Sequence, residues 1–98
     1  MIEVTRLSGE DPMEFKVLIR ESTGQTSHIV TMAAAHFARL FPVVPPERCI
    51  EAAFRFLLER EPREAILRRF DIDVISRYFL EFEGELPLYL TVAAGCGP

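Results

Sequence analysis

Cysteine is scarce in this sequence. Its 98 residues contain two, Cys49 and Cys96, and two cysteines cannot build the dense disulfide framework of a small secreted domain. The start of the chain, Met1 to Glu3, lacks the basic residues, apolar run and cleavage site of a secretory signal. No uninterrupted apolar run approaches the roughly 20 residues needed to cross a bilayer. These absences predict a protein of the reducing cytoplasm.

Motifs for phosphate, metal or covalent chemistry are also missing. The lone Gly24 and the pair Ser76 and Arg77 fit neither a phosphate loop nor a nucleophile elbow, because both motifs need glycines at fixed positions. The side chains with imidazole or thiol ligand atoms are His28, His36, Cys49 and Cys96. No two of them share the short spacing of a structural zinc site. We therefore predict no metal ion and no cofactor.

The composition indicates one soluble domain. Hydrophobic residues make up 49% of the chain, which argues against disorder, and the length allows a single core. The formal net charge is −4, so the overall field does not attract nucleic acid or anionic lipid.

Hydrophobic alternation in the first third of the chain predicts three β-strands. The segments 2–7, 15–20 and 26–32 have the period of two that is expected when one face of a sheet is buried. The turn residues of 8–12 and 21–25 separate them, and the second loop has hairpin length and contains Gly24. We expect an antiparallel meander.

Helical spacing governs the next part of the chain. The apolar residues of its longest stripe are Ile50, Ala53, Phe54, Leu57 and Leu58. They follow the i, i+3, i+4, i+7, i+8 pattern of a helix with one buried face. Pro46 suits a first helical turn, and Pro62 disfavours helical geometry at Glu61. The expected helix therefore runs from Pro46 to about Arg60.

Shorter helices are expected on both sides of this one. Thr31 can cap a helix that begins at Met32 or Ala33 and ends before Pro42. A short helical turn is expected at 63–70. Asp71 or Asp73 can then accept a hydrogen bond from a free amide of a last helix, whose apolar residues are Ile75, Tyr78, Phe79 and Phe82.

The predicted fold is α+β, with a three-stranded antiparallel meander followed by three or four packed helices. A single domain is expected over 1–85, with a core led by Val4, Phe15, Val17, Ile19, Val30, Phe37, Ile50, Phe54, Leu57, Ile75 and Phe79. In the tail, 86–98, leucines alternate with other residues as in a strand. Pro87 cannot donate to a ladder, so such a strand is restricted to a sheet edge, in this chain or in a second copy.

Three segments carry a resemblance to known proteins: 28–31 (HIVT), 51–62 (EAAFRFLLEREP) and 70–79 (FDIDVISRYF). In them the chain resembles a family of small prokaryotic proteins of unknown function, each about the size of one domain. The resemblance extends over roughly 1–85 and is strongest after Glu47, although the family has proline at the position of Leu80. It implies a prokaryotic cytoplasmic protein and brings no reaction, ligand or catalytic residue.

Candidate chemistry is weak in the residues themselves. Cys49 can act as a nucleophile only if a histidine such as His28 or His36 reaches it, and a small buried cysteine in an amphipathic helix is the more common case. Phe54 and Phe56 point about 200° apart on one helix, so one of them can face a partner while the other faces the core. The alternative is that a neighbouring helix packs on the second ring.

The favoured function is that of a small non-enzymatic interaction or regulatory domain, whose partner is a protein or a second copy of the chain. A candidate interaction surface consists of Phe56, Arg60, Arg63, Arg68, Arg69 and Arg77. The alternative is a nucleic-acid-associated regulator that uses the region from Arg60 to Arg77, where interleaved carboxylates largely cancel the positive charge. A small enzyme that uses Cys49 with a histidine ranks third.

Overall fold

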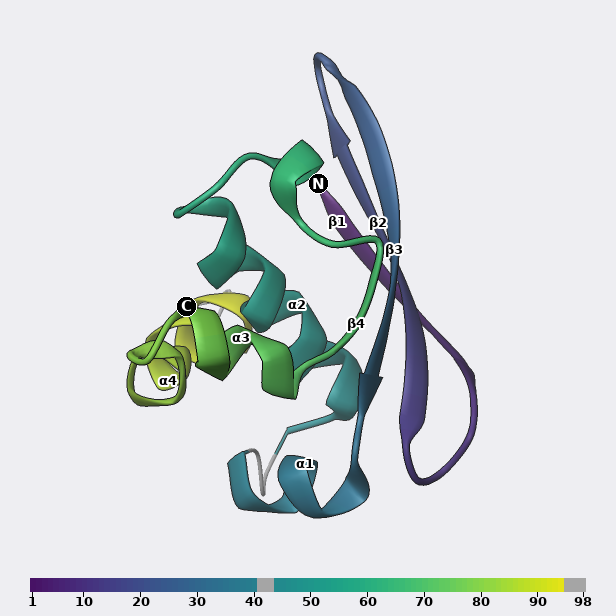
Figure 1. Ribbon diagram of the computed structural model, residues 1–98, viewed down its shortest axis with the longest axis vertical. Coiled ribbons are helices and arrows are strands. Elements are labelled where there is room, and N and C mark those ends of the chain that lie inside the picture. Colours follow the sequence, from purple (N-terminus) through teal and green to yellow (C-terminus); the bar gives the residue numbers. More distant parts are fainter. Residues whose placement is uncertain (41–43, 95–98) are drawn as a thin grey trace.

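The computed structural model describes residues 1–40 and 44–94, and Figure 1 shows a β-sheet with helices packed on one of its faces. The strands are β1 (Ile2–Ser8), β2 (Met13–Glu21), β3 (Gly24–Met32) and β4 (Arg69–Asp71). The helices are α1 (Ala34–Leu40), α2 (Pro46–Leu58), the 3-10 turn η1 (Arg63–Ala65), α3 (Asp73–Tyr78) and α4 (Phe82–Ala94). The predicted α+β class is confirmed.

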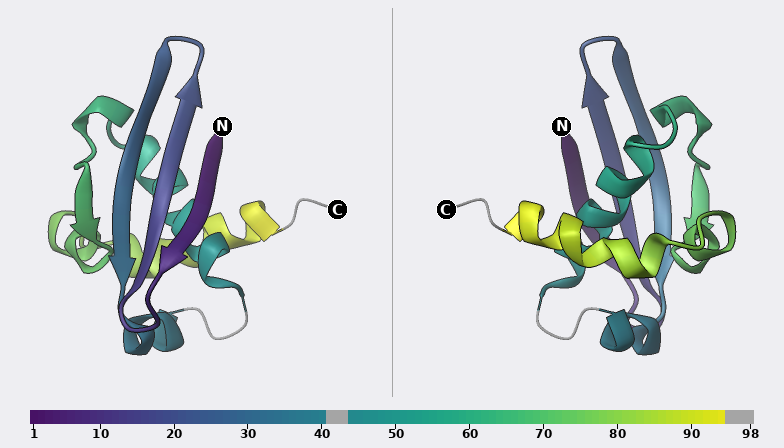
Figure 2. Two further views of the ribbon diagram at one scale, coloured as in Figure 1. Left: turned by 90° about the vertical axis from the view of Figure 1, so that its right-hand side faces the viewer. Right: turned by 90° about the vertical axis from the view of Figure 1, so that its left-hand side faces the viewer.

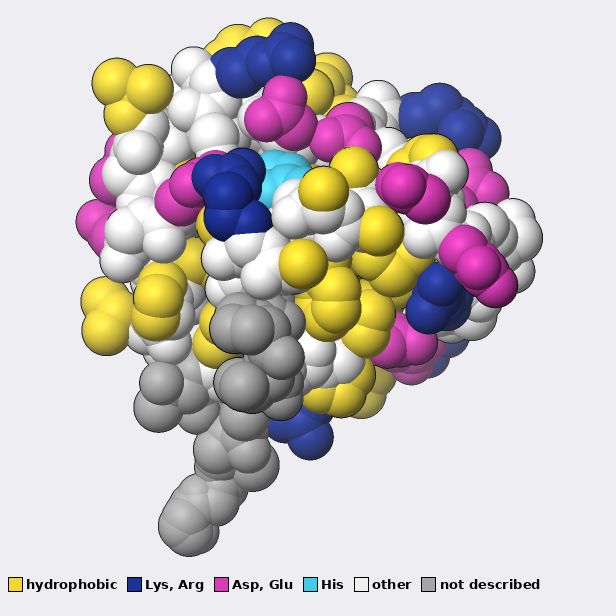
Figure 3. Space-filling model, turned by 90° about the horizontal axis from the view of Figure 1, so that it is seen from below, with side chains coloured by type: hydrophobic (Ala, Val, Ile, Leu, Met, Phe, Trp, Pro, Cys, Tyr) yellow, Lys and Arg dark blue, Asp and Glu magenta, His cyan; other side chains and the backbone are white. Residues whose placement is uncertain are grey.

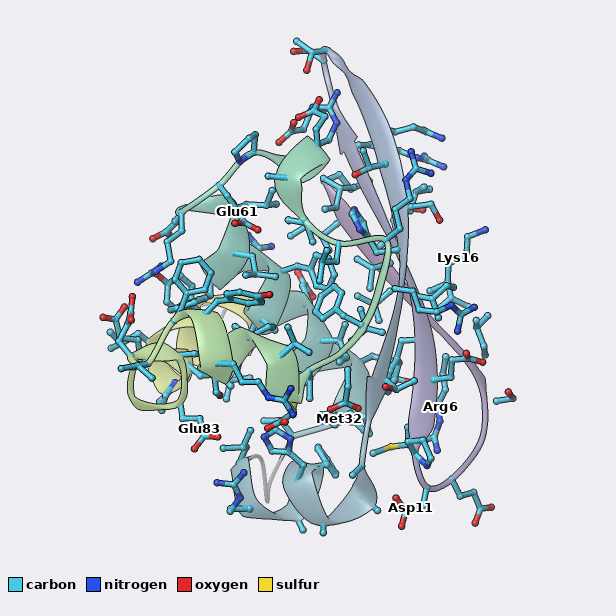
Figure 4. All side chains as sticks on the ribbon, in the orientation of Figure 1. Arg6, Asp11, Lys16, Met32, Glu61 and Glu83 are labelled. Atoms are coloured by element: carbon cyan, nitrogen blue, oxygen red, sulfur yellow. The ribbon has the colours of Figure 1, made fainter. Side chains whose placement is uncertain are left out.

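The three-stranded meander is confirmed. β1 pairs with β2 and β2 with β3, both antiparallel, and Met13, Phe15, Val17 and Ile19 of β2 are buried beneath the helices. The β2–β3 turn is tight, because Glu21 pairs with Gly24 across two residues, and Gly24 has a φ of 140° that other residues rarely adopt. The labelled Lys16 side chain points away from the helices (Figure 4).

A fourth strand extends the sheet where a helical turn is expected. β4 runs parallel to β3, with Phe70 opposite Val30. Two backbone bonds frame the pairing: Ile29 N donates to Arg68 O at 2.7 Å, and Ile72 N donates to Thr31 O at 2.9 Å. The expected helical turn at 63–70 is correct only for η1. A strand of three residues is too short to show a period of two, so the pattern could not reveal it.

The first helix begins later than expected and has a different cap. Thr31 belongs to β3, where its hydroxyl donates to Asp71 Oδ1 at 2.7 Å instead of accepting from a helix amide. The amide of Ala34 donates to Asp11 Oδ1 at 3.0 Å, so the β1–β2 loop supplies the acceptor. The expected stop at Pro42 lies outside the described residues.

Helix α2 is the centre of the molecule, and its predicted extent is confirmed. Phe54 and Phe56 are both fully buried, because α2 lies between the sheet and α4. The Phe54 ring packs near His28 and Phe70, on the sheet side. Phe56 packs on the opposite side, against Phe82 and Tyr89 of α4. Of the two alternatives for this pair, packing by a neighbouring helix is therefore correct, and neither ring faces a partner.

The C-terminal segment is a helix, which corrects the expected edge strand for 86–94; residues 95–98 lie outside the described residues. Its apolar contacts come from Phe82, Leu86, Tyr89 and Leu90, which have helical spacing. Leu86, Leu88 and Leu90 also alternate, which is why the sequence predicts a strand. Packing against α2 selects the helix, because residues three and four positions apart then face α2 together. Helix α4 spans the expected boundary at 85, and Leu86, just beyond that boundary, is buried.

The predicted core is confirmed in large part. Of its members, Val4, Phe37 and Phe79 are only partly buried, and the others are buried. His28 and His36 are buried as well. No helix within 1–40 and 44–94 combines the length and the apolar character needed to span a membrane.

Candidate functional site

An apolar groove of about 370 Å³ opens beside α3, and we call it the α3 groove. Its walls are Leu57, Glu61, Ala65, Ile66, Leu67, Phe70, Val74, Ile75, Tyr78 and Phe79. They come from α2, η1, β4, α3 and the segments that adjoin these elements, so the groove exists only once the chain has folded. The volume lies in the range of small-ligand sites, roughly 300–1,000 Å³.

Hydrogen bonds hold the segments around the groove in place. Asp71 Oδ2 accepts from the Asp73 amide at 3.0 Å and so starts α3, which confirms the expected capping by Asp71. Proline at position 62 ends the turn after α2, and η1 then closes with Ala65 N donating to Pro62 O at 2.9 Å. Leu67 O is 2.8 Å from His28 Nδ1, which ties this wall to β3.

Exposed apolar side chains mark the groove. Among the described residues, the large hydrophobic side chains that are exposed are Met1, Leu7, Leu67, Tyr78, Leu80 and Leu88. Two of these six, Leu67 at 51% and Tyr78 at 73% exposure, line the α3 groove. Exposed large apolar groups clustered around a concave surface are typical of interaction sites.

Among the residues that the structure describes, Glu61 is the one charged residue in the wall of the α3 groove. Figure 4 shows its side chain at the end of α2. Two arginines adjoin groove residues in the chain. Arg68, next to Leu67, is exposed and has no ion pair among the described residues, while Arg77, next to Tyr78, pairs with Asp73 at 2.9 Å. The groove thus combines an apolar floor with one carboxylate, and it suits an apolar group that has a positive charge or a hydrogen-bond donor nearby.

The structure separates the predicted surface residues into two groups. Arg68, Arg69 and Arg77 are exposed, with Arg69 held 3.4 Å from Glu14. Phe56, as shown above, is fully buried and cannot contribute to a surface. Arg63 is also buried, and its guanidinium bonds Glu21 and, at 3.0 Å, the Thr23 hydroxyl, so it fastens η1 to the β2–β3 turn.

Arg60 fastens α2 to α4. Its guanidinium carbon lies 3.6 Å from the centroid of the Phe56 ring. The same group donates to Glu85 Oε1 at 2.8 Å and to Tyr89 Oη at 3.3 Å. The hydrogen bond to Tyr89 is the main reason that the pKa of Arg60 is raised. Arg60 and Arg63 therefore have structural partners within the chain, and the predicted surface is reduced to its three exposed arginines.

Cys49 is a buried core residue. Its side chain is fully enclosed at the start of α2, and burial raises the pKa of the thiol far above its ordinary value. A nucleophilic cysteine needs the opposite, a thiolate that a substrate can reach. The geometry agrees with the structural role expected for Cys49. Cys96, the other thiol considered for a metal site, lies outside the described residues.

His28 is buried against Phe54 and bonded through both ring nitrogens. Nδ1 faces the carbonyl oxygen of Leu67 at 2.8 Å, so Nδ1 carries the proton, and Nε2 accepts from the Thr26 hydroxyl at 2.9 Å. Desolvation by burial lowers the pKa of His28 below its usual 6.5, and the nearby Arg68 charge acts in the same direction. The neutral imidazole is therefore part of the fold.

Acid should weaken the fold through His28. Because its folded-state pKa lies below 6.5, the unfolded chain binds the proton first. We expect the free energy of unfolding to be highest above pH 6.5 and to decrease as the pH falls toward the folded-state pKa. Urea denaturation between pH 7.5 and 5, as approximate limits above the carboxylate range, should show this slope in the native protein and not in H28Q. H36Q, which retains His28, should show the same slope as the native protein. An unchanged slope in H28Q would contradict the lowered pKa of His28 as its cause.

A cluster of polar side chains lies at the α1 end of the molecule. Figure 3 shows a histidine side chain among acidic and basic ones on this face. His36 Nε2 lies 3.7 Å from Glu83 Oε2, and Glu83 also accepts from Arg39 at 3.2 Å and from the Ser76 hydroxyl at 3.4 Å. Within the described part of the chain, no three histidine, cysteine or acidic side chains are grouped to hold a metal ion. The cluster joins α1 to α4.

No family model, curated protein or solved structure matches this chain. The resemblance to a family of small prokaryotic proteins therefore stays a prediction, and the groove must be interpreted from its own residues.

Sequence reasoning missed most of the α3 groove. Leu67 was assigned to a helical turn and Tyr78 to a buried stripe, yet both are exposed. Their spacing predicts burial, because a periodic pattern cannot show that α3 ends at Tyr78 before a second layer covers it. In the sequence, Pro62 and the mixed charges of residues 63–69 were the signs that this part of the groove wall is irregular in structure.

Proposed function

We propose that this protein is a non-enzymatic interaction domain that takes an apolar side chain of a protein partner into the α3 groove. The observation that carries the proposal is the pair of exposed side chains, Leu67 and Tyr78, at a groove with an apolar floor. Burying one large apolar side chain is worth about 1.5–3 kcal/mol. That amount alone gives weak affinity, so the partner must also contact the surface around the groove.

The charge distribution narrows the partner chemistry. Glu61 in the wall favours a lysine, an arginine or an amide donor next to the apolar anchor of the partner. Arg68, the exposed residue next to Leu67, favours an acidic residue farther along the partner's chain. The segment that fits best is a short amphipathic peptide with one large apolar anchor flanked by a basic residue.

A selection from a random peptide library displayed on phage tests this function. We expect the immobilised full chain to enrich peptides that contain a leucine, phenylalanine or tryptophan beside a basic residue. L67E should lose at least about tenfold in affinity for such a peptide, because a carboxylate replaces the exposed apolar wall beside Glu61. Fluorescence anisotropy with the synthetic peptide measures the change.

L80E is the matched control. Leu80 is 88% exposed and does not line the groove, so the same substitution there should leave peptide affinity unchanged. Circular dichroism must show that both variants are folded. A selection without any enriched motif, or a peptide that binds L67E as tightly as the native protein, would refute the proposed site.

A further inference from the structure

The outer edge of β1 has free backbone groups. Met1 and Arg20 exchange two hydrogen bonds, of 2.7 and 2.8 Å, so they form a bonded pair of the β1–β2 ladder. In an antiparallel ladder bonded and non-bonded pairs alternate, so the N–H and C=O groups of Ile2 and Val4 point away from β2. β1 is the end of the sheet, and among the described residues no backbone or side chain bonds this edge. Such an edge is a template for another strand.

A second groove, of about 550 Å³, lies beneath this edge, and we call it the β1 groove. Its walls are Met1, Ile2, Ile19, Glu21, Arg55, Leu58, Glu59, Leu88 and Tyr89. Met1 at 73% and Leu88 at 66% exposure are two more of the six exposed large hydrophobic side chains. The free edge and an exposed apolar surface therefore adjoin one another.

Helix α4 extends past the same edge. The two opposite views in Figure 2 both show its C-terminal half projecting beyond β1. The sequence of this half, 87–94, contains no charged residue. Within this half of α4 the Leu88 side chain is exposed, so its apolar surface is not covered by its own chain.

We propose that the partner on this face is a second copy of the chain, paired through β1. A two-fold axis perpendicular to the sheet joins two β1 strands antiparallel and keeps the helices of both copies on one face. If the axis passes Val4, then Ile2 meets Arg6 and Glu3 meets Thr5 of the other copy, so no like charges are opposed. Met1 then meets Leu7, which is 45% exposed.

The same symmetry places the projecting half of each α4 beside the β1 groove of the other copy. Strand pairing along a few residues buries too little surface for a stable dimer, which needs about 800 Å² from each partner. Leu88, on this half of α4, supplies further apolar contact. The two four-stranded sheets become one continuous sheet, and the outer edge of β1 is no longer open. This assembly is independent of the α3 groove.

Light scattering coupled to size-exclusion chromatography tests the proposal. We expect the full chain at high micromolar concentration to have twice the mass of one chain, and L88E to have the mass of one chain, because two α4 helices would then bring carboxylates into an apolar contact. V4P should also be monomeric, since it removes an N–H from the outer edge only. Leu80 is more exposed than Leu88 and does not line the β1 groove, so L80E should stay dimeric.

Amide hydrogen exchange gives a site-specific readout. The amides of Ile2 and Val4 should be protected in the native dimer and exchange rapidly in L88E, while the amides of β2 stay protected in both. L88E is the decisive variant if V4P fails to fold. A native protein that is monomeric at high micromolar concentration, a larger assembly, or an L88E variant that remains dimeric would each overturn the proposal.

Discussion

Substitution of Phe56 by alanine is expected to lower the free energy of unfolding by about 3–5 kcal/mol. The Phe56 ring is fully enclosed and lies 5.0 Å from the ring of Phe82, measured between centroids, and 5.7 Å from those of Phe79 and Tyr89. Its loss would leave a cavity between α2 and α4 that rigid neighbours cannot fill. Urea denaturation followed by circular dichroism measures the change.

Leu80 provides the comparison for this substitution. Because 88% of its surface is exposed, L80A should change the free energy of unfolding by no more than about 0.5 kcal/mol. If F56A costs as little as L80A, then α4 does not pack on α2, and the position of the C-terminal helix is wrong.

Substitution of Arg60 by alanine is expected to destabilise the protein by about 1–3 kcal/mol. It removes the guanidinium that stacks on Phe56 and donates to Glu85 and Tyr89. R60K should recover only part of the loss, since an ammonium group cannot stack on the ring and reach both partners in one plane. Thermal or urea denaturation of the two variants tests this.

Arg77 is the matched control for Arg60. It also pairs with a carboxylate, Asp73, but its side chain is 72% exposed. Exposed ion pairs of this kind contribute little, so R77A should cost no more than about 0.5 kcal/mol. Equal effects of R60A and R77A would show that the contacts of Arg60 do not hold α4 in place.

The two proposed surfaces can be distinguished with the same set of variants. L67E should lose peptide binding and keep the mass of the dimer, because Leu67 lines the α3 groove. L88E should become monomeric and keep peptide binding, because Leu88 lines the β1 groove. A single variant that abolished both properties while remaining folded would show that the two grooves act together.

None of the six residues predicted for an interaction surface lines the α3 groove. The sequence drew attention to the region from Arg60 to Arg77, and the α3 groove is built largely from that region. Two of the five arginines predicted within it, Arg60 and Arg63, are engaged by carboxylates of α4 and of β2. Partners 25 and 42 positions away along the chain are not visible in local spacing.

Local periodicity by itself determined the meander and helix α2. Alternation at 15–20 and the stripe from Ile50 to Leu58 each have a single regular solution that buries the apolar side chains. Turn and cap residues reinforced them, with Gly24 in the hairpin and Pro46 at the start of α2. These elements depend on nearest neighbours in the chain, so the sequence alone was sufficient.

Tertiary structure decided the elements whose pattern has two solutions. The leucines from Leu86 to Leu90 suit a strand or a helix, and the rings of Phe56 and Tyr89 select the helix because α2 is available to pack against. β4 exists because β3 has an open edge beside it, and Phe54 and Phe56 are both buried because α2 has a layer on each side. Burial depends on which surfaces meet in space, and only the folded chain brings those surfaces together.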